Sequence, residues 1–127
     1  MAHIFKPGNI WSGSRALAVL TNPTELARKK GCLKRSWPIE FRGIRYADSE
    51  AAYKANKCSD NYALMVEVLV CKLRQYPEIM AAIVASGGAE FIASCSHVVY
   101  GKSWWEGDGL ESPFIQALSE AFSVVSS

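Results

Sequence analysis

Four side chains between residues 50 and 57 are of types that could act together in catalysis. They share the spacing i, i+3, i+4 and i+7, which places them along one face of a helix: Glu50, Tyr53, Lys54 and Lys57. An acid, an aromatic ring and two lysines on one face could form the edge of an active site. The same spacing also fits an exposed helix face with a Glu50–Lys54 ion pair worth about 0.3–0.5 kcal/mol. The residue types alone leave both interpretations open.

The segment "SWWEGDG" is a second candidate. Two adjacent tryptophans in a glycine-rich loop do not both face the core, so Trp104 or Trp105 is a candidate to stack on a planar ligand ring. The alternative is that one fills the core and the other covers it. Three nearby acids could bind a metal or sugar hydroxyls, or simply keep the loop hydrated: Glu106, Asp108 and Glu111.

Other chemistries have weaker signals. His97 is more typical of a buried histidine with satisfied hydrogen bonds than of a base. The four cysteines are scattered without a Cys-x-x-Cys pair, and there are only two histidines, so no zinc spacing is present. No Gly-x-Gly-x-x-Gly or Walker loop occurs. We therefore expect no metal and no cofactor.

Charge is distributed unevenly. Residues 24–57 contain nine Lys or Arg against four acids, whereas residues 78–127 contain one Lys against six acids. These halves are either two solvated faces that attract each other or a basic wall that receives a phosphorylated ligand. The net charge of +2 does not demand nucleic acid, which would enter only as a modified substrate.

The start of the chain and its apolar runs bear on location. No apolar run approaches the roughly 20 residues that span a bilayer, and "MAHIFKPGN" lacks the apolar core of a signal peptide. We therefore expect no membrane association, a cytoplasmic protein and reduced cysteines. The sequence leaves the oligomeric state open.

The helices and strands that would position these residues can be predicted from the spacing of apolar residues and from turn formers. A chain of 127 residues is sufficient for one domain, residues 1–127. Turn formers and apolar spacing predict helices near 23–31, from Asp48 or Ser49 onward, and at 61–75, 77–86 and 113–125. A hairpin or bent strand is expected around Gly43, an extended segment at 89–101, and loops at 6–15 (with Trp11) and 101–113. We expect a mostly helical α+β domain with few short strands.

The motifs then resemble a known superfamily. "SEAAYKANK" is similar to the S-E-H-x-(Y/F)-Q-A-x-K helix start of the YbiA-like, or NADAR, superfamily. "TNP" stands where that family has S-N-F, and "KLRQYPEIMAAIVASGG" resembles its K-F-x-x-N-P helix pair ending in T-G. "SWWEGDGLESPFIQAL" is similar to its ending around W-G. The resemblance covers roughly residues 8–122, with the motifs in the family's order.

The resemblance implies a YbiA-like fold and an N-glycosidase that needs no metal. Its substrate would be a small-molecule nucleotide or ADP-ribosyl compound: a phosphorylated ribosylamino-pyrimidine or ADP-ribosylated guanine. It implies Glu50 as the catalytic acid and Lys57 as its basic partner, with Asn22 in the entrance loop and Trp105 stacking on the base. A buried carboxylate suits an oxocarbenium-like sugar, because it can stabilise the cation while orienting or deprotonating water.

Further side chains complete the expected site. Trp104 is the alternative stacking ring, and Arg42 or Arg45 would join Lys57 on a phosphate. Trp11, Tyr53 and Asp108 are the remaining candidates for substrate binding.

Several family positions differ here. The family's His after the Glu is Ala51, its Glu after the T-G helix is Ala93, and its Asp before W-G has no clear counterpart. Two alternatives therefore stand beside the enzyme: a non-catalytic module that binds ADP-ribose or a nucleotide, and an interaction domain whose tryptophans pack against a partner.

Overall fold

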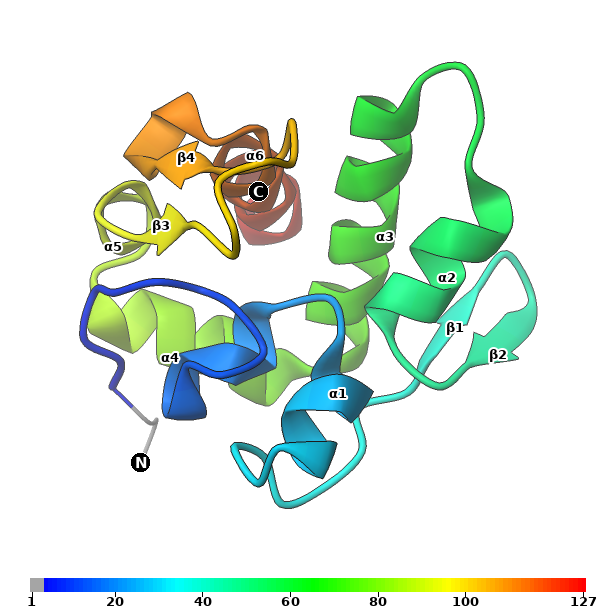
Figure 1. The fold of residues 1–127 in the computed structure, drawn as a ribbon, viewed down its shortest axis with the longest axis horizontal. Coiled ribbons are helices and arrows are strands. Elements are labelled where there is room, and N and C mark those ends of the chain that lie inside the picture. Colours follow the sequence, from blue (N-terminus) through cyan, green and yellow to red (C-terminus); the bar gives the residue numbers. More distant parts are fainter. Residues whose placement is uncertain (1–3) are drawn as a thin grey trace.

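Two helices, α3 (Asn61–Gln75) and α6 (Pro113–Ser126), form the centre of the fold. In Figure 1 α3 stands upright and α6 is seen end-on beside it. Val68 and Leu69 of α3 and Ile115 and Leu118 of α6 are essentially inaccessible to water. Apolar residues recur at helical spacing in both segments, and burial of these two faces against each other is the main source of core stability.

The computed structural model describes residues 4–127, which make up one mostly helical α+β domain. Shorter elements surround the central pair: η1 (Arg15–Leu20), α1 (Thr24–Lys29), α2 (Ser49–Asn56), α4 (Pro77–Ser86), α5 (Ala89–Ala93) and η2 (Gly109–Glu111), with η denoting a 3₁₀ helix. Within residues 4–127, no helix is long and apolar enough to cross a membrane. The predicted fold class is confirmed.

The strands form two small antiparallel sheets. β1 (Ile39–Phe41) and β2 (Ile44–Tyr46) are a hairpin closed by Arg42 and Gly43, both with positive φ, at 53° and 80°. Two consecutive positive φ values define the tight turn that suits the twist of a hairpin, and glycine adopts them freely. β3 (Ser96–His97) pairs with β4 (Gly107–Asp108), and Asn9 forms a bridge to Ser96.

Asp48 fixes the start of α2. One carboxylate oxygen accepts a hydrogen bond from the Ala51 N–H at 2.9 Å, as an N-cap residue does, and the other accepts from the Glu25 N–H at 3.0 Å. Asp48 rather than Ser49 is therefore the cap. The same side chain joins the first turns of α1 and α2, which places the Asn22 segment beside Glu50.

The segment 89–101 differs from the expectation of a strand or extended stretch. Ala89–Ala93 is helical, and extended pairing is confined to Ser96–His97. Gly87 and Gly88 have positive φ values of 127° and 66°, which end α4 and allow a second helix to begin at once. Phe91 and Ile92 then reach the core from adjacent positions of this short helix. A short apolar run such as residues 89–93 fits a strand and a helix equally well. The break at Gly87 and Gly88 determines that a new helix forms here.

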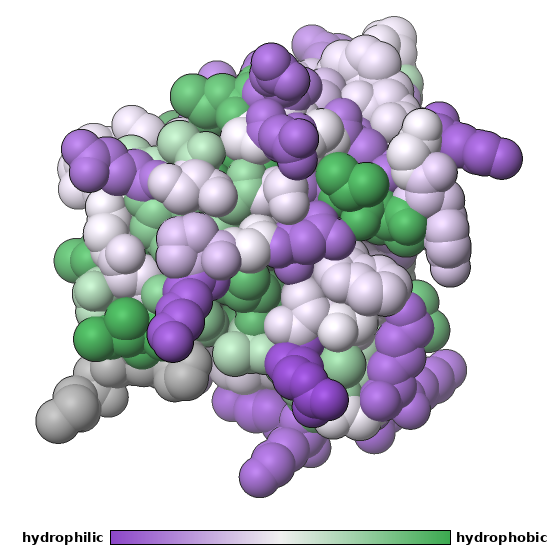
Figure 2. Space-filling model, turned by 60° about the vertical axis from the view of Figure 1, so that its left-hand side comes forward, coloured by the Kyte–Doolittle hydropathy of each residue, from purple (hydrophilic) through white to green (hydrophobic). Residues whose placement is uncertain are grey.

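The two charged halves of the chain meet at few points. The ion pairs within 4.0 Å in residues 4–127 are Arg28–Glu25, Arg35–Glu78 and Arg42–Glu67, and Arg35–Glu78 alone joins the basic half to the acidic half. Figure 2 shows one face of the molecule, where hydrophilic side chains are interspersed with small apolar areas. Direct pairing between the halves therefore contributes little to the fold.

Candidate functional site

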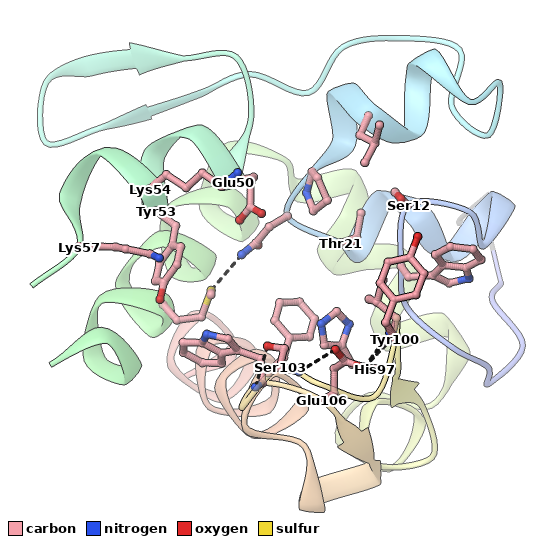
Figure 3. Close-up of a pocket in the computed structure, with 18 residues that line it drawn as sticks. Ser12, Thr21, Glu50, Tyr53, Lys54, Lys57, His97, Tyr100, Ser103 and Glu106 are labelled. Atoms are coloured by element: carbon pink, nitrogen blue, oxygen red, sulfur yellow. Dashed lines mark hydrogen bonds between the residues drawn. The ribbon is translucent and has the colours of Figure 1, made fainter.

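A cavity of about 440 Å³ opens between α2 and the loop that follows β3. Figure 3 shows Glu50, Tyr53, Lys54 and Lys57 on one side of it and His97, Ser103 and Glu106 on the other. Trp11 and Ser12, from the loop before η1, and Tyr100 complete the rim. The cavity is large enough for a mononucleotide-sized ligand and is lined by both aromatic and charged groups.

Glu50 lies in the first turn of α2, half-buried, with its carboxylate pointing into the cavity (Figure 3). Burial raises the pKa of this carboxyl, nearby Lys54 and Lys57 act in the opposite direction, and Asp48 adds to the increase. Glu50 is in none of the ion pairs within 4.0 Å found in residues 4–127. The face of α2 that carries Glu50, Tyr53 and Lys54 therefore lines the cavity. Lys57 lies just outside the helix, as its C-cap residue, and the exposed Lys54 and Lys57 stand at the mouth with Glu50 further in.

Asn22 links the cavity wall to the start of α2. Its backbone carbonyl accepts hydrogen bonds from the N–H groups of Thr24 at 2.8 Å and Glu50 at 3.2 Å. Its side-chain Nδ2 lies 3.0 Å from the Met65 sulfur, whereas the buried Oδ1 has no hydrogen-bond partner in the described chain. A buried amide oxygen without a partner is costly. Asn22 lines the cavity, but this oxygen itself is shielded from solvent.

The neighbouring residue, Thr21, is held by a buried lysine. Lys72 of α3 is 2% exposed and donates a hydrogen bond from Nζ to the Thr21 carbonyl at 2.7 Å. Burial lowers the pKa of the Lys72 ammonium to about 7, although nearby Asp48 opposes this change. The wall made by Thr21 and Asn22 is thus attached to the core helix.

Aromatic side chains form another part of the cavity wall. Trp105 meets Tyr53 edge to face, with ring centroids 5.9 Å apart, and Trp104 packs edge-on against Trp105 at 4.9 Å. The Trp105 carbonyl accepts hydrogen bonds from the Phe114 N–H and the Ser112 hydroxyl, which fixes Trp105 against the start of α6. Trp105 is therefore positioned before a ligand binds, as a stacking platform requires.

Glu106 holds the loop at the cavity rim. Its Oε1 accepts hydrogen bonds from the N–H groups of Val99, Tyr100 and Gly101, and its Oε2 accepts from that of Ser103, at 2.7–3.1 Å. Removal from water raises the pKa of this carboxyl, but the four backbone donors outweigh that effect and lower it to about 2. The carboxylate of Glu106 is thus engaged in holding the loop.

We predict that Glu106→Ala disorders the segment 99–103, because four backbone donors lose their common acceptor. Hydrogen exchange of these four amides is expected to become faster, and exposed Glu111→Ala is the control that leaves them protected. Since folding lowers the pKa of Glu106 from 4.5 to about 2, its stabilisation is present above pH 4.5 and is lost as the pH falls toward 2. Unchanged protection in Glu106→Ala would contradict this role.

His97 faces Glu50 from across the cavity (Figure 3). Its Nδ1 lies 2.7 Å from the Ile10 carbonyl, which requires a proton on Nδ1, and its ring packs on Phe114 with centroids 4.6 Å apart. Burial lowers the pKa of the imidazole, while the hydrogen bond to Ile10 and the charge of Glu106 act in the opposite direction. The sequence did not predict that His97 belongs to this site. Its position depends on the pairing of segments that lie far apart in the chain, and such pairing leaves no local pattern in the sequence.

The structure brings six of the nine predicted site residues to this cavity: Trp11, Asn22, Glu50, Tyr53, Lys57 and Trp105. Arg42, Trp104 and Asp108 do not line it. Arg42 sits in the β1–β2 turn and forms two hydrogen bonds with Glu67 of α3, at 2.9 and 2.7 Å. Trp104 is 66% exposed, and Asp108 pairs with Ser96 in the second sheet.

The metal alternative finds no support in side-chain placement. Within residues 4–127, no group of three or more His, Cys, Asp or Glu side chains is arranged to hold a metal ion. The four cysteines are unpaired, with Cys95 buried and Cys58 exposed.

Fold and site together define a small, mostly helical α+β domain with a cavity lined by aromatic residues, a half-buried glutamate and two lysines. No family model, curated protein or solved structure matches the chain.

Proposed function

We propose that the protein is an N-glycosidase of the YbiA-like type, which hydrolyses the bond between ribose and a base in a nucleotide intermediate or an ADP-ribosyl adduct. The observation that carries the proposal is the Glu50 carboxylate, half-buried in a cavity that it shares with Trp105 and Lys57. The order of motifs along the chain, which resembles that superfamily, supports the same function.

The chemistry follows from the residues around Glu50. Breaking an N-glycosidic bond leaves positive charge on the sugar, and a desolvated carboxylate stabilises that charge more strongly than one in water does. Trp105 would stack on the departing base, and Asn22, whose backbone carbonyl accepts the Glu50 N–H, would keep Glu50 in place beside the sugar. Glu50 would stabilise the oxocarbenium-like ion and orient the attacking water.

In this proposal, two lysines bind the phosphate of the ligand. Lys54 and Lys57 lie at the mouth of the cavity and are exposed, so they would pair with a ligand phosphate without leaving water. Arg42 is not available for this role, because its guanidinium is engaged with Glu67. We further propose a cytoplasmic setting, since unpaired cysteines are usual where thiols are kept reduced.

Product analysis tests the function. The folded protein is incubated with a phosphorylated ribosylamino-pyrimidine and, separately, with ADP-ribosylated guanosine, and free base is measured by chromatography. We expect time-dependent release of base from one of them. Calorimetry with ADP-ribose and with ribose 5-phosphate establishes whether the cavity binds these groups.

A non-catalytic binding module is the second candidate, and one observation favours it. Of the two glutamates among the described residues that line the cavity, Glu106 is engaged by backbone donors, which leaves Glu50 as the available carboxylate in the cavity. Most glycosidases use two carboxyl groups. Saturable binding without release of base from either substrate would favour the module over the enzyme.

A further inference from the structure

A second proton-transfer group is needed if the proposed function holds. Hydrolysis of an N-glycoside consumes one water, whose proton must leave as the C–O bond forms, and the departing base must gain a proton. Glu106 does not serve, because accepting four backbone N–H groups holds its carboxylate in the loop. Ser12, Thr21 and Ser103 line the cavity but are poor bases.

His97 has the required geometry. The Ile10 carbonyl fixes the proton on Nδ1, so the second ring nitrogen, Nε2, carries a lone pair and acts as an acceptor. Within residues 4–127, no hydrogen bond occupies that nitrogen. The tilted contact with Phe114 restricts the ring, and the imidazole points into the cavity opposite Glu50 (Figure 3). An oriented, neutral imidazole on the cavity wall is the arrangement found in general bases.

We propose that His97 is a catalytic base in this reaction and acts together with Glu50; the proposal rests on the N-glycosidase function. The C1′–N bond breaks and its electron pair passes to the base nitrogen, while Glu50 stays ionised and stabilises the sugar cation. Water then bonds to C1′ through its oxygen and gives one proton to His97 Nε2. The imidazolium finally passes that proton to the base nitrogen, which restores neutral His97 and balances the reaction.

The surroundings of His97 set the direction of the pH dependence. Glu106, in the loop that follows β3, is the charged group that acts most directly on the imidazole of His97. The other two contacts are uncharged: the Ile10 carbonyl and the phenyl ring of Phe114 in α6. Glu50 and Lys54 of α2, and Lys57 at the end of that helix, face His97 across the cavity. Since burial moves its pKa below 6.5, His97 is neutral and able to accept a proton at pH 7.

The test compares His97→Gln and His97→Ala with wild type on whichever substrate releases its base. We expect kcat to fall about 10²–10⁴-fold with KM changed less than about threefold. His97→Gln should lose the part of the acidic decline of kcat/KM that protonation of His97 causes, and keep the part that protonation of Glu50 causes. Imidazole added to His97→Ala should restore part of the rate in proportion to its neutral form. Glu50→Gln is the matched control, because it keeps the imidazole in place and should not respond to added imidazole.

Other outcomes overturn the inference. A kcat within threefold of wild type in His97→Gln excludes a catalytic base. A loss of rate without rescue by imidazole, in variants whose thermal melting matches wild type, assigns His97 a structural role. If His97→Ala fails to fold, the rate and pH profile of His97→Gln decide. Absence of base release by the wild-type protein refutes the proposed function itself, and is thereby distinguished from failure of the His97 assignment alone.

Discussion

Replacing Glu50 by glutamine is expected to lower turnover about 10²–10⁴-fold while leaving ligand binding within about tenfold of wild type. Glutamine keeps the size of the side chain and its place on α2, but removes the negative charge that would stabilise the sugar cation. The effect should therefore appear in kcat, since the interaction is strongest in the transition state. Single-turnover release of base, measured alongside calorimetric affinity, separates the two quantities.

The control for this substitution is Glu25→Gln, in the first turn of α1. Glu25 also lies near a helix start, but it pairs with Arg28 and does not line the cavity. It is expected to retain full turnover. A folded Glu50→Gln protein with wild-type turnover would refute Glu50 as the catalytic carboxylate, whatever the behaviour of the control.

The second large effect concerns stability. Folding lowers the pKa of Lys72 from 10.5 to about 7, so between these values the unfolded chain binds more protons than the folded protein. The free energy of unfolding should therefore rise with pH across this window, by about 1.4 kcal/mol per pH unit in its middle. Below pH 7 both states are protonated, and this contribution no longer changes with pH.

Lys72→Met isolates that contribution. Methionine has a side chain of similar length and carries no charge, so it suits this buried site. The substitution also removes the hydrogen-bond donor of the Thr21 carbonyl. The wild-type protein should gain stability relative to Lys72→Met as the pH rises from 7 to 10, measured by urea unfolding at each pH. Lys29→Met, on the exposed side of α1, should run parallel to wild type. Parallel curves for Lys72→Met would show that its ammonium is not desolvated in the folded state.

Much of the fold could be predicted from local pattern. The apolar spacing of 61–75 and the Pro and Gly residues around 77–88 mark helices that the structure confirms. Arg42–Gly43 forms the expected hairpin turn. The helix at 89–93 was not predicted, because five residues are too few for periodicity to separate a helix from a strand.

Less of the candidate site could be predicted from local sequence pattern. Glu50, Tyr53 and Lys54 share one helix, so their common face follows from spacing alone, and Lys57 follows as the residue that ends this helix. The cavity placement of His97 depends on pairing with a segment 87 residues away, and no local signal encodes that pairing. Arg42 illustrates the opposite problem: its charge suited a phosphate, but Glu67 of α3 pairs with it and neutralises it.

Pairing between the first and last parts of the chain also determines whether the cavity can form. The Ile10 N–H donates to the Ser96 carbonyl, and the Ser96 N–H donates to the Gly8 carbonyl, so these segments hold one wall together. The opposite wall, on α2, needs contacts with α3 and the adjacent hairpin. The wall that carries Glu50 is thus built from segments close together in sequence, whereas the wall that carries His97 joins residues 87 positions apart. Because closing so long a loop costs conformational entropy, the His97 wall carries the larger entropic cost of forming the cavity.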